Sequence, residues 1–402
     1  MTDTELLFNP LEPGFTDDPY PAYRRLRAED PVHEHPFGFW LLTSHEDVSA
    51  ILRSGLSVDA RHLGDGVVRE QIDTLDEDGL RVIRMSMLDA DPPDHTRLRS
   101  LVTKAFTRRA VAALEPRITE LVDAALDTLA DAGHGDLVET LAFPLPFEVI
   151  SGMLGMPPTD AERIRRLSGK LVLSLEAVLE PEVLEEISRA GEELTGLTRE
   201  LIAWKRANPA DDLLTALIAA EEDGDRLSDD ELIAQVILLY VAGHETTVNL
   251  IANGTVALLR HPDQLAALRE NPVLAANAVE ELLRYDSPVQ QTRRITLAPY
   301  SVGGREIPAH SFVIACLASA NRDESVFGPD AELLRLDREN ARQHVSFGAG
   351  PHHCLGAILA RLEGRVALER LVRRFPRLSL DGEVEWNGRI NLRGPARLPV
   401  AV

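Results

Sequence analysis

One of only two cysteines in the chain lies in a crowded loop near the C-terminal end, FGAGPHHCLG at residues 347–356. Cys354 opens the amphipathic run CLGAILARLEGRVALERLVRRF, which predicts a helix. The helix dipole and the free N–H groups at such an N-terminus favour a thiolate. The loop also lets another group approach its backbone closely, because there are no side chains at Gly348, Gly350 and Gly356.

Three kinds of site use a thiol in such a loop. A zinc site needs further ligands at suitable spacing, and the chain has no second cysteine motif. A cysteine nucleophile needs a histidine base, for which His352 and His353 are adjacent in sequence only. An axial thiolate on haem iron accounts for the glycines and the helix N-terminus together. A c-type haem is excluded because the chain has no C-x-x-C-H motif.

A second chemical feature interrupts a long apolar segment, the stretch AGHETT at residues 242–247. A glycine weakens a helix interior by about 1 kcal/mol, and a buried glutamate is costly unless it is paired. A threonine can bond back to a carbonyl one turn earlier and bend the helix. The stretch is therefore either a kink with an internally satisfied carboxylate or an acid–alcohol pair, Glu245 and Thr246, that moves protons.

Two further groups of charged residues are weaker signals. His95 and Arg99 are four apart, so they share one helix face, and residues 95–109 contain five Lys or Arg and no acid. That segment is either a solvated basic face or a binding site for carboxylates or an acidic partner. Glu281 and Arg284 form an i,i+3 pair that by itself is common on helix surfaces.

Several elements must position these groups. Ser228 and Glu231 form a capping box that begins a helix of about 30 residues, roughly 45 Å long, ending before Pro262. This helix is apolar nearly all round, which predicts a buried spine. The run PVHEHPFGFWLLTS at residues 31–44 predicts a hairpin with its turn at residues 36–38.

Helical periods dominate the rest of the chain, and the sequence has no linker and no internal repeat. We expect one domain over residues 1–402, mainly α with small β-sheets (α+β), with a long central helix crossing the site. The expected β-rich parts are 1–60, 293–320 and 375–402. The expected helical parts are 90–290 and 354–375.

Composition excludes several classes of protein. The formal net charge of −23 repels a phosphate backbone, so a nucleic-acid partner is not expected. The N-terminal stretch lacks the pattern of a signal peptide, and the longest apolar run, residues 236–243, is too short to span a bilayer. Two cysteines make no disulfide framework. We expect a cytoplasmic protein that is not bound to membranes.

Four motifs stand in one order along the chain: DPPDHTRLR, AGHETT, ELLR and FGAGPHHCLG. This set resembles the cytochrome P-450 family of haem-thiolate monooxygenases. The cysteine loop matches the family pattern Phe-x-x-Gly-x-x-x-Cys-x-Gly at Phe347, Gly350, Cys354 and Gly356. The resemblance covers essentially the whole chain, and it points to the soluble actinobacterial members that tailor macrolides and other natural products.

The resemblance implies a cytochrome P-450 fold that binds haem b, with Cys354 as the axial ligand of the iron. It implies that the two haem propionates are held by His95, Arg99, Arg294 and His352. The loop around the sulfur is implied to be shaped by Phe347, Gly348, Gly350 and Gly356.

On the opposite side of the haem, the resemblance implies that Ala242 and Gly243 line an oxygen-binding notch and that Glu245 and Thr246 deliver protons to dioxygen. Glu281 and Arg284 match a structural pair that supports the cysteine loop. The chain departs from the family between residues 327 and 340, where FGPDAELLRLDREN replaces the usual Asp-Pro-x-Arg-Phe stretch. The third partner of the pair is therefore expected to be Arg335 or Arg338.

The implied function is insertion of one oxygen atom from O2 into a C–H bond of a medium-to-large apolar natural product, with a macrolide or polyketide as the leading class. Terpenoid or steroid, aromatic and peptide substrates remain alternatives, as do epoxidation, oxidative coupling, peroxide-driven chemistry and a non-enzymatic haem or small-molecule binding protein. The expected substrate contacts are Val241, Val289, Gln290, Gln291, Thr292, Ile390, Asn391 and Leu392. The polar members, Gln290, Gln291 and Asn391, either orient oxygens on a substrate or are satisfied inside the protein.

The chain contains no flavin or iron–sulfur domain, so electrons are expected from a separate ferredoxin and its NAD(P)H-dependent reductase. We expect a monomer with a basic docking face for the ferredoxin. The residues expected to form that face are Arg97, Lys104, Arg108, Arg109, Arg361 and Arg365.

Overall fold

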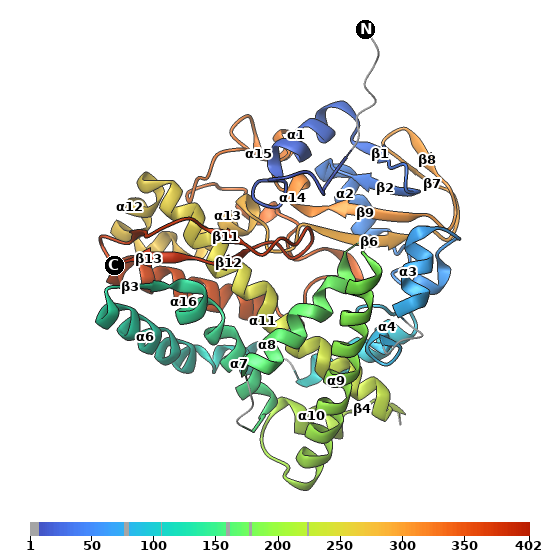
Figure 1. Cartoon of the computed structure of the whole chain (residues 1–402), viewed down its shortest axis with the longest axis horizontal. Helices are drawn as coiled ribbons and strands as arrows, with labels where there is room; N and C mark the ends of the chain where they lie inside the picture. The colour runs from blue at the N-terminus through green and yellow to red at the C-terminus, as the bar shows by residue number, and fades with distance from the viewer. Residues whose placement is uncertain (1–7, 76–79, 106, 158–160, 177–178, 223–224) are drawn as a thin grey trace.

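The computed structural model describes residues 8–75, 80–105, 107–157, 161–176, 179–222 and 225–402. Helices dominate, and the largest sheet lies at the upper right of Figure 1, which confirms the predicted mainly α fold with small β-sheets. The α-helices are α1 (Tyr20–Glu29), α2 (His45–Arg53), α3 (Val67–Leu75), α4 (Asp94–Ala105), α5 (Arg108–Ala112), α6 (Glu115–Ala132), α7 (Pro144–Leu154), α8 (Ala161–Leu171), α9 (Pro181–Ala207), α10 (Leu213–Ala219), α11 (Asp229–Arg260), α12 (Pro262–Glu270), α13 (Ala275–Tyr285), α14 (Leu317–Ala320), α15 (Glu324–Phe327) and α16 (Ala357–Arg374).

Short helical turns and strands connect these helices. The turns are η1 (Ala60–His62), η3 (Ile83–Met85), η4 (Val138–Ala142), η5 (Val172–Leu175), η6 (Pro272–Leu274), η7 (Ala341–Gln343) and η8 (Gly350–His352). The strands are β1 (Val32–Glu34), β2 (Phe39–Leu42), β3 (His134–Asp136), β4 (Glu221–Glu222), β5 (Asp225–Arg226), β6 (Gln291–Ile295), β7 (Tyr300–Val302), β8 (Arg305–Ile307), β9 (Phe312–Cys316), β10 (Ser379–Leu380), β11 (Glu385–Trp386), β12 (Pro395–Arg397) and β13 (Pro399–Ala401).

The largest sheet has the strand order β1-β2-β9-β6. β1 and β2 form the predicted antiparallel hairpin, with Val32 opposite Leu42, and its turn contains Gly38 at φ +82°. β2 runs parallel to β9, and β6 returns antiparallel to β9 with Gln291 opposite Cys316. This sheet brings the start of β6, which follows the Glu–Arg helix α13, next to the N-terminal part of the chain.

The spine of the molecule is α11, which crosses the centre of Figure 1. Its 32 residues correspond to about 48 Å at 1.5 Å per residue. The capping box is present: Ser228 accepts from the backbone N–H of Glu231, and the Glu231 carboxylate accepts from the N–H of Ser228 at 2.8 Å. The largest apolar cluster packs α11 against α6, α7, α9 and α16, so the helix is buried along most of its length, as predicted.

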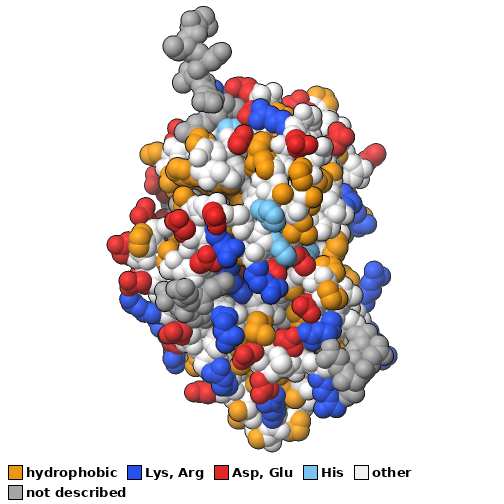
Figure 2. Space-filling model, turned by 90° about the vertical axis from the view of Figure 1, so that its right-hand side faces the viewer, with side chains coloured by type: hydrophobic (Ala, Val, Ile, Leu, Met, Phe, Trp, Pro, Cys, Tyr) orange, Lys and Arg blue, Asp and Glu red, His pale blue; other side chains and the backbone are white. Residues whose placement is uncertain are grey.

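Within the part of the chain that the structure describes, no helix combines the length and the apolar character needed to cross a membrane. On the face over α3 and α4, basic, acidic and apolar side chains are interspersed (Figure 2).

Candidate active site

The cysteine loop is fixed by its backbone. The N–H of Cys354 donates to the carbonyl of Phe347 at 2.8 Å, which closes the loop just before α16. Gly350 has φ +69°, and a Cβ there would lie 2.5 Å from the carbonyl oxygen of Leu52 at the end of α2. Gly348 also has a positive φ, +66°. Two of the predicted glycines are therefore required by conformation, and Gly350 also by close packing.

The Cys354 thiol lies in a recess of the fold. It is exposed, yet enough protein surrounds it that burial raises the pKa of Cys354, despite backbone donation from Gly356 and Ala357 and the positive charge of Arg99. A thiol in such a recess becomes a thiolate outright when it coordinates a metal ion. Within the described residues Cys354 belongs to no group of three or more metal-ligating side chains, so a zinc site built from protein ligands is not supported there.

Phe347 is held beside the sulfur loop by a charged neighbour. The guanidinium of Arg361 lies 4.4 Å from the centre of the Phe347 ring, a cation–π contact. Arg361 in turn donates to Glu280 at 2.9 and 3.1 Å, and His344 contacts the same carboxylate at 3.0 Å. Burial would raise the pKa of Glu280, but these partners hold it at about 2. Arg361 is therefore engaged inside the protein as well as lying near the surface.

Four basic side chains gather above the loop from α4, β6 and η8. The rings of His95 and His352 lie with their centres 4.2 Å apart. Arg294 is 4% exposed and donates to the backbone carbonyl of Arg293. Burial and the neighbouring charges of His95, Arg294 and Arg99 lower the pKa of His352 to about 3. Burial also lowers the pKa of Arg294, to about 10.

This basic cluster fits the carboxylates of a haem. The buried Nε2 of His95 has no hydrogen-bond partner within the described residues. Among the residues that the structure describes, the acid whose charge favours protonation of His95 and Arg294 is Asp91. Asp91 already accepts from Ser57 and from the N–H of Val58. Buried positive charge of this kind needs anionic partners. Two propionates beside a flat apolar ring meet that need.

The polar stretch of the spine helix α11 lies where the helix becomes partly exposed. Ala242 is exposed although the helix around it is buried. Thr246 donates to the carbonyl of Ala242 at 2.9 Å, the back-bond that the sequence suggested. Glu245 pairs with Arg389 at 2.8 Å and lies 3.5 Å from His244. Burial would raise the pKa of Glu245, but His244 and Arg389 hold it at about 2.

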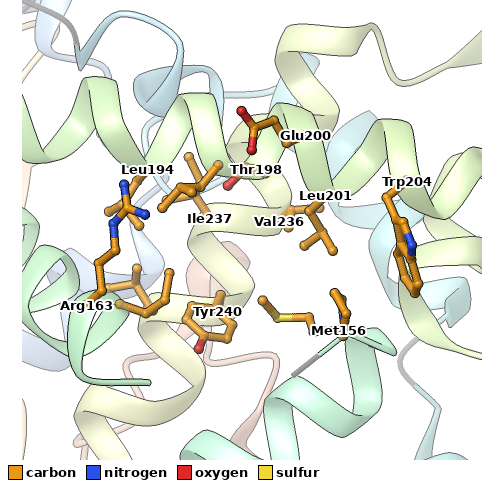
Figure 3. A pocket seen from close by; sticks show the side chains of 14 residues that line it. Met156, Arg163, Leu194, Thr198, Glu200, Leu201, Trp204, Val236, Ile237 and Tyr240 are labelled. Atoms are coloured by element: carbon orange, nitrogen blue, oxygen red, sulfur yellow. The ribbon is translucent and has the colours of Figure 1, made fainter. Parts of the chain in front are cut away.

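Two predicted residues of α11 face other elements. A Cβ at Gly243 would lie 3.0 Å from Ile150 of α7, so close helix packing gives this glycine a structural reason. Val241 is one of the residues that line a cavity of about 300 Å³. The cavity lies between α8, α9, α11 and the residues that follow α7, and Figure 3 shows Ile237 and Tyr240 on the α11 side. At 3.6 residues per turn, Val241 is about 100° around the helix from Ala242 and about 140° from Thr246. That Val241 contacts substrate stays a prediction.

The two predicted glutamines have hydrogen-bond partners inside the protein, which is the internal alternative. Gln290 is fully buried and donates to the carbonyl of Ser287 at 2.6 Å. Gln291 is buried and donates to the hydroxyl of Tyr23 at 3.2 Å. Both amides support the protein interior because local strand and loop geometry turns them inward.

The other predicted substrate contacts come from the start of β6 and from the loop between β11 and β12. Val289 forms an isolated bridge with Leu392, which is buried. The side chains of Thr292, Ile390 and Asn391 are half-buried. Asn391 donates to Leu175 at 3.2 Å. These residues bring the start of β6 together with the loop between β11 and β12.

The Glu281–Arg284 pair is completely buried. Arg284 donates to Glu281 at 2.6 and 2.8 Å, and it also donates to the carbonyls of Asn321, Ala331 and Leu333. The pair therefore fixes the chain that leads into the cysteine loop. The alternative, an ordinary exposed ion pair on a helix surface, is wrong.

Arg338 supplies the third side chain of this network. It is 4% exposed and donates to Glu281 at 3.1 Å. Arg335 contributes only its backbone N–H, at 2.9 Å, while its side chain pairs with Asp330 and Asp337 at the surface. The departure from the usual family sequence is therefore compensated by Arg338, which lies three residues after Arg335.

Two functional candidates were not predicted from the sequence. Arg389 pairs with Glu245 across 144 positions of sequence, and no local pattern marks it. Glu363 of α16 is 1% exposed with both carboxylate oxygens unpaired within the described residues, and burial raises its pKa to about 8. The sequence did contain a signal for Glu363, because it is an acid on the apolar face of the predicted amphipathic helix.

A recessed thiol at a helix N-terminus, a buried basic cluster and an acid–alcohol pair on a buried spine helix indicate a haem-thiolate enzyme. The family model for cytochrome P-450 matches residues 171–387. The vitamin D(3) 25-hydroxylase of Pseudonocardia autotrophica is 44% identical over 401 residues, which cover 96% of this chain and 94% of that protein. The chain therefore belongs to the cytochrome P-450 family and is a monooxygenase with a haem-iron cofactor.

Two other relatives cover both chains nearly completely. The 6-deoxyerythronolide B hydroxylase of Saccharopolyspora erythraea is 40% identical over 397 residues, 96% of each chain. The crystal structure of a myxobacterial cytochrome P-450 in complex with myristic acid superposes with a TM-score of 0.89 at 39% identity, covering 98% of both chains. The fold that the sequence motifs implied is thus confirmed.

Proposed function

We propose that this chain is a single-domain, monomeric, cytoplasmic monooxygenase that hydroxylates a medium-to-large apolar natural product, with a macrolide or polyketide as the leading class. The observation that carries the substrate class is the near-complete coverage of 6-deoxyerythronolide B hydroxylase, whose name specifies the compound that it hydroxylates, together with that of a relative named as a polyketide biosynthesis cytochrome P-450. The largely aliphatic set Val289, Thr292, Ile390 and Leu392 supports an apolar substrate.

The proposed cofactor is haem b. Cys354 would hold its iron through the thiolate, and Phe347 packs beside the sulfur loop against Arg361. His95, Arg99, Arg294 and His352 bind the propionates. When bound, the haem supplies the oxygen-activating chemistry, which thiolate ligation promotes.

The side chains above the haem control protons and water. Thr246 offers a hydroxyl on the exposed side of α11, next to Ala242. Glu245, one residue earlier, is the acid that passes protons to it through ordered water. The apolar lining excludes other water, because the half-buried side chains of Val289 and Ile390 offer no hydrogen bond.

A steroid-like substrate is the second candidate, because the relative with 44% identity is a vitamin D(3) hydroxylase. Aromatic and peptide substrates, and epoxidation, coupling or peroxide-driven chemistry on the same scaffold, are outcomes that product analysis distinguishes.

The deciding experiment is a binding screen of purified holoprotein. Macrolactones, linear polyketides, secosteroids, fatty acids, aromatics and cyclic peptides are titrated while the low-to-high-spin change of the Soret band is recorded. Compounds that bind are then incubated with a surrogate ferredoxin system, and the products are identified. A polyketide that binds and gains one hydroxyl supports the proposal. A secosteroid as the only productive ligand replaces it with the second candidate.

Replacement of Thr246 by alanine removes the hydroxyl that receives protons from the Glu245 side. We expect a larger fraction of reducing equivalents to appear as hydrogen peroxide, and product formation to fall by about 10²-fold or more, the range for loss of a proton-transfer group. Thr246→Ser is the matched control and should retain most of the coupling. Fully coupled turnover in the alanine variant removes Thr246 from the proton path.

The proposed electron donor is a ferredoxin that docks on the surface around α5. Of the predicted basic face, Arg97 pairs with Glu231, Arg361 with Glu280 and Arg365 with Glu115. The side chain of Lys104 lies outside the described residues. Arg108 and Arg109 remain exposed on α5, which packs on α16.

Double reversal of Arg108 and Arg109 to glutamate should slow reduction by an acidic ferredoxin and weaken its dependence on ionic strength, because rim charges act mainly on association rates. The control is Arg189→Glu on α9, which packs on α8 and α11. Stopped-flow reduction rates over a range of salt concentrations measure both. Equal rates and equal salt dependence in the two variants contradict docking on α5.

A further inference from the structure

Arg389, in the loop between β11 and β12, contacts two elements at once. Its Nη1 pairs with the Glu245 carboxylate of α11 at 2.8 Å, and its Nη2 donates to the carbonyl of Gly169 in the last turn of α8 at 3.2 Å. A Cβ at Gly169 would lie 3.0 Å from this Nη2. A glycine therefore makes room for the arginine, which is 18% exposed.

The residues after Arg389 bind the segment that follows Gly169. We name residues 169–176, the end of α8 with η5, the roof segment. The N–H groups of Ile390 and Asn391 both donate to the Glu176 carboxylate, at 3.1 and 3.0 Å, and the Asn391 amide donates to Leu175. Four hydrogen bonds thus join the roof segment to residues 389–391, so a displacement of one stretch would strain its contacts with the other.

Arg389 also contributes to the charge of Glu245. The carboxylate is largely buried, and within the described residues its charged or titratable neighbours are His244 on its own helix, which lowers the pKa of Glu245 more, and Arg389 from the loop. Burial raises the pKa of Glu176, although Glu176 accepts two backbone N–H groups from the loop and the charge of Arg389 acts on it as well. A carboxylate held ionised by such partners is a poor proton donor near neutrality.

We propose that Arg389 is a positioning residue that couples the acid of the proton path, Glu245, to the roof segment. A bulky substrate that displaces residues 169–176 pulls residues 389–391 with them and withdraws Arg389 from Glu245. Glu245 then takes up and passes on protons only while substrate is present. This coupling rests on the proposed function for the role of Glu245, and it restrains futile consumption of reducing equivalents in the substrate-free enzyme.

The first measurement is the titration of Glu245 in substrate-free holoprotein. Infrared difference spectra between the parent protein and Glu245→Gln identify the carboxyl band, which is followed against pH. In Arg389→Gln we expect the midpoint to rise by about one to three pH units, the effect of removing a close opposite charge. Arg397→Gln, an exposed arginine on β12 paired with Glu385, is the control and should leave the midpoint unchanged.

The second measurement uses reciprocity, since a coupling between two sites acts in both directions. Glu245→Gln should accelerate hydrogen exchange in residues 165–176 and 387–392 by about fivefold or more, while peptides of α6 stay unchanged. An unaltered Glu245 midpoint in Arg389→Gln, or unaltered roof exchange in Glu245→Gln, overturns the coupling. Neither measurement involves turnover, so they are independent of the binding screen that tests the substrate class.

Discussion

Replacement of Cys354 by serine is expected to abolish monooxygenase turnover and the thiolate spectrum of the reduced carbon monoxide complex. A hydroxyl in the same recess does not become an anionic sulfur ligand, so the electron donation that favours O–O cleavage is lost. The recess itself should persist, because Cys354 holds the loop through its backbone N–H to Phe347. Haem content, spectrum and product formation are measured on the same preparation.

The other cysteine provides the matched control. Cys316 lies in β9 with no exposed surface, and burial raises the pKa of its thiol far above the usual range. Cys316→Ala should keep the thiolate spectrum and turnover, with only the modest loss of stability of a small core truncation. If Cys354→Ser retains the thiolate spectrum, or Cys316→Ala loses it, the assignment of the axial ligand is wrong.

Replacement of Glu281 by alanine is expected to destabilise the protein by about 3–5 kcal/mol, because it leaves buried arginines without their shared counter-charge. Arg284 and Arg338 are 0% and 4% exposed and both donate to this carboxylate. A loss of that size is a large fraction of the stability of a typical protein. Denaturant midpoints are measured on apoprotein and holoprotein, together with haem content and soluble yield.

Three controls separate this effect from ordinary loss of charge. Glu29→Ala removes the surface pair with Arg25, which is 3.1 Å long and exposed on both sides, and should cost at most about 1 kcal/mol. Arg338→Ala should resemble Glu281→Ala, whereas Arg335→Ala should resemble the surface control. Equal stability of Glu281→Ala and Glu29→Ala contradicts a supporting role for the buried network.

The sequence predicted the parts of the site that depend on short-range signals. The capping box at Ser228 and the Gly38 turn each act within a few residues, so the structure contains both. The cysteine loop was likewise visible, because a glycine with a positive φ and a helix start leave local marks. Such features need no knowledge of the tertiary contacts.

The sequence gives no signal where distant elements decide the outcome. A helix that is apolar all round carries no sign of which side faces which cavity, so the sequence could not show that Val241 lines the cavity beside α8 and α9. Gln290 and Gln291 find partners in Ser287 and Tyr23, and only the folded chain shows whether an amide is satisfied internally. Arg389 meets Glu245 from 144 positions away, beyond the reach of any periodicity.

The basic cluster of His95, Arg99, Arg294 and His352 has a consequence for the supply of the protein in the cell. Without anions these side chains are buried beside like charges, and burial together with those charges lowers the pKa of His352. Under the proposed function, haem binds only the folded chain and adds stability that grows with its free concentration. Because proteolysis acts on the unfolded fraction, haem availability sets how much enzyme survives, and the cell is spared a pool of empty oxygenase.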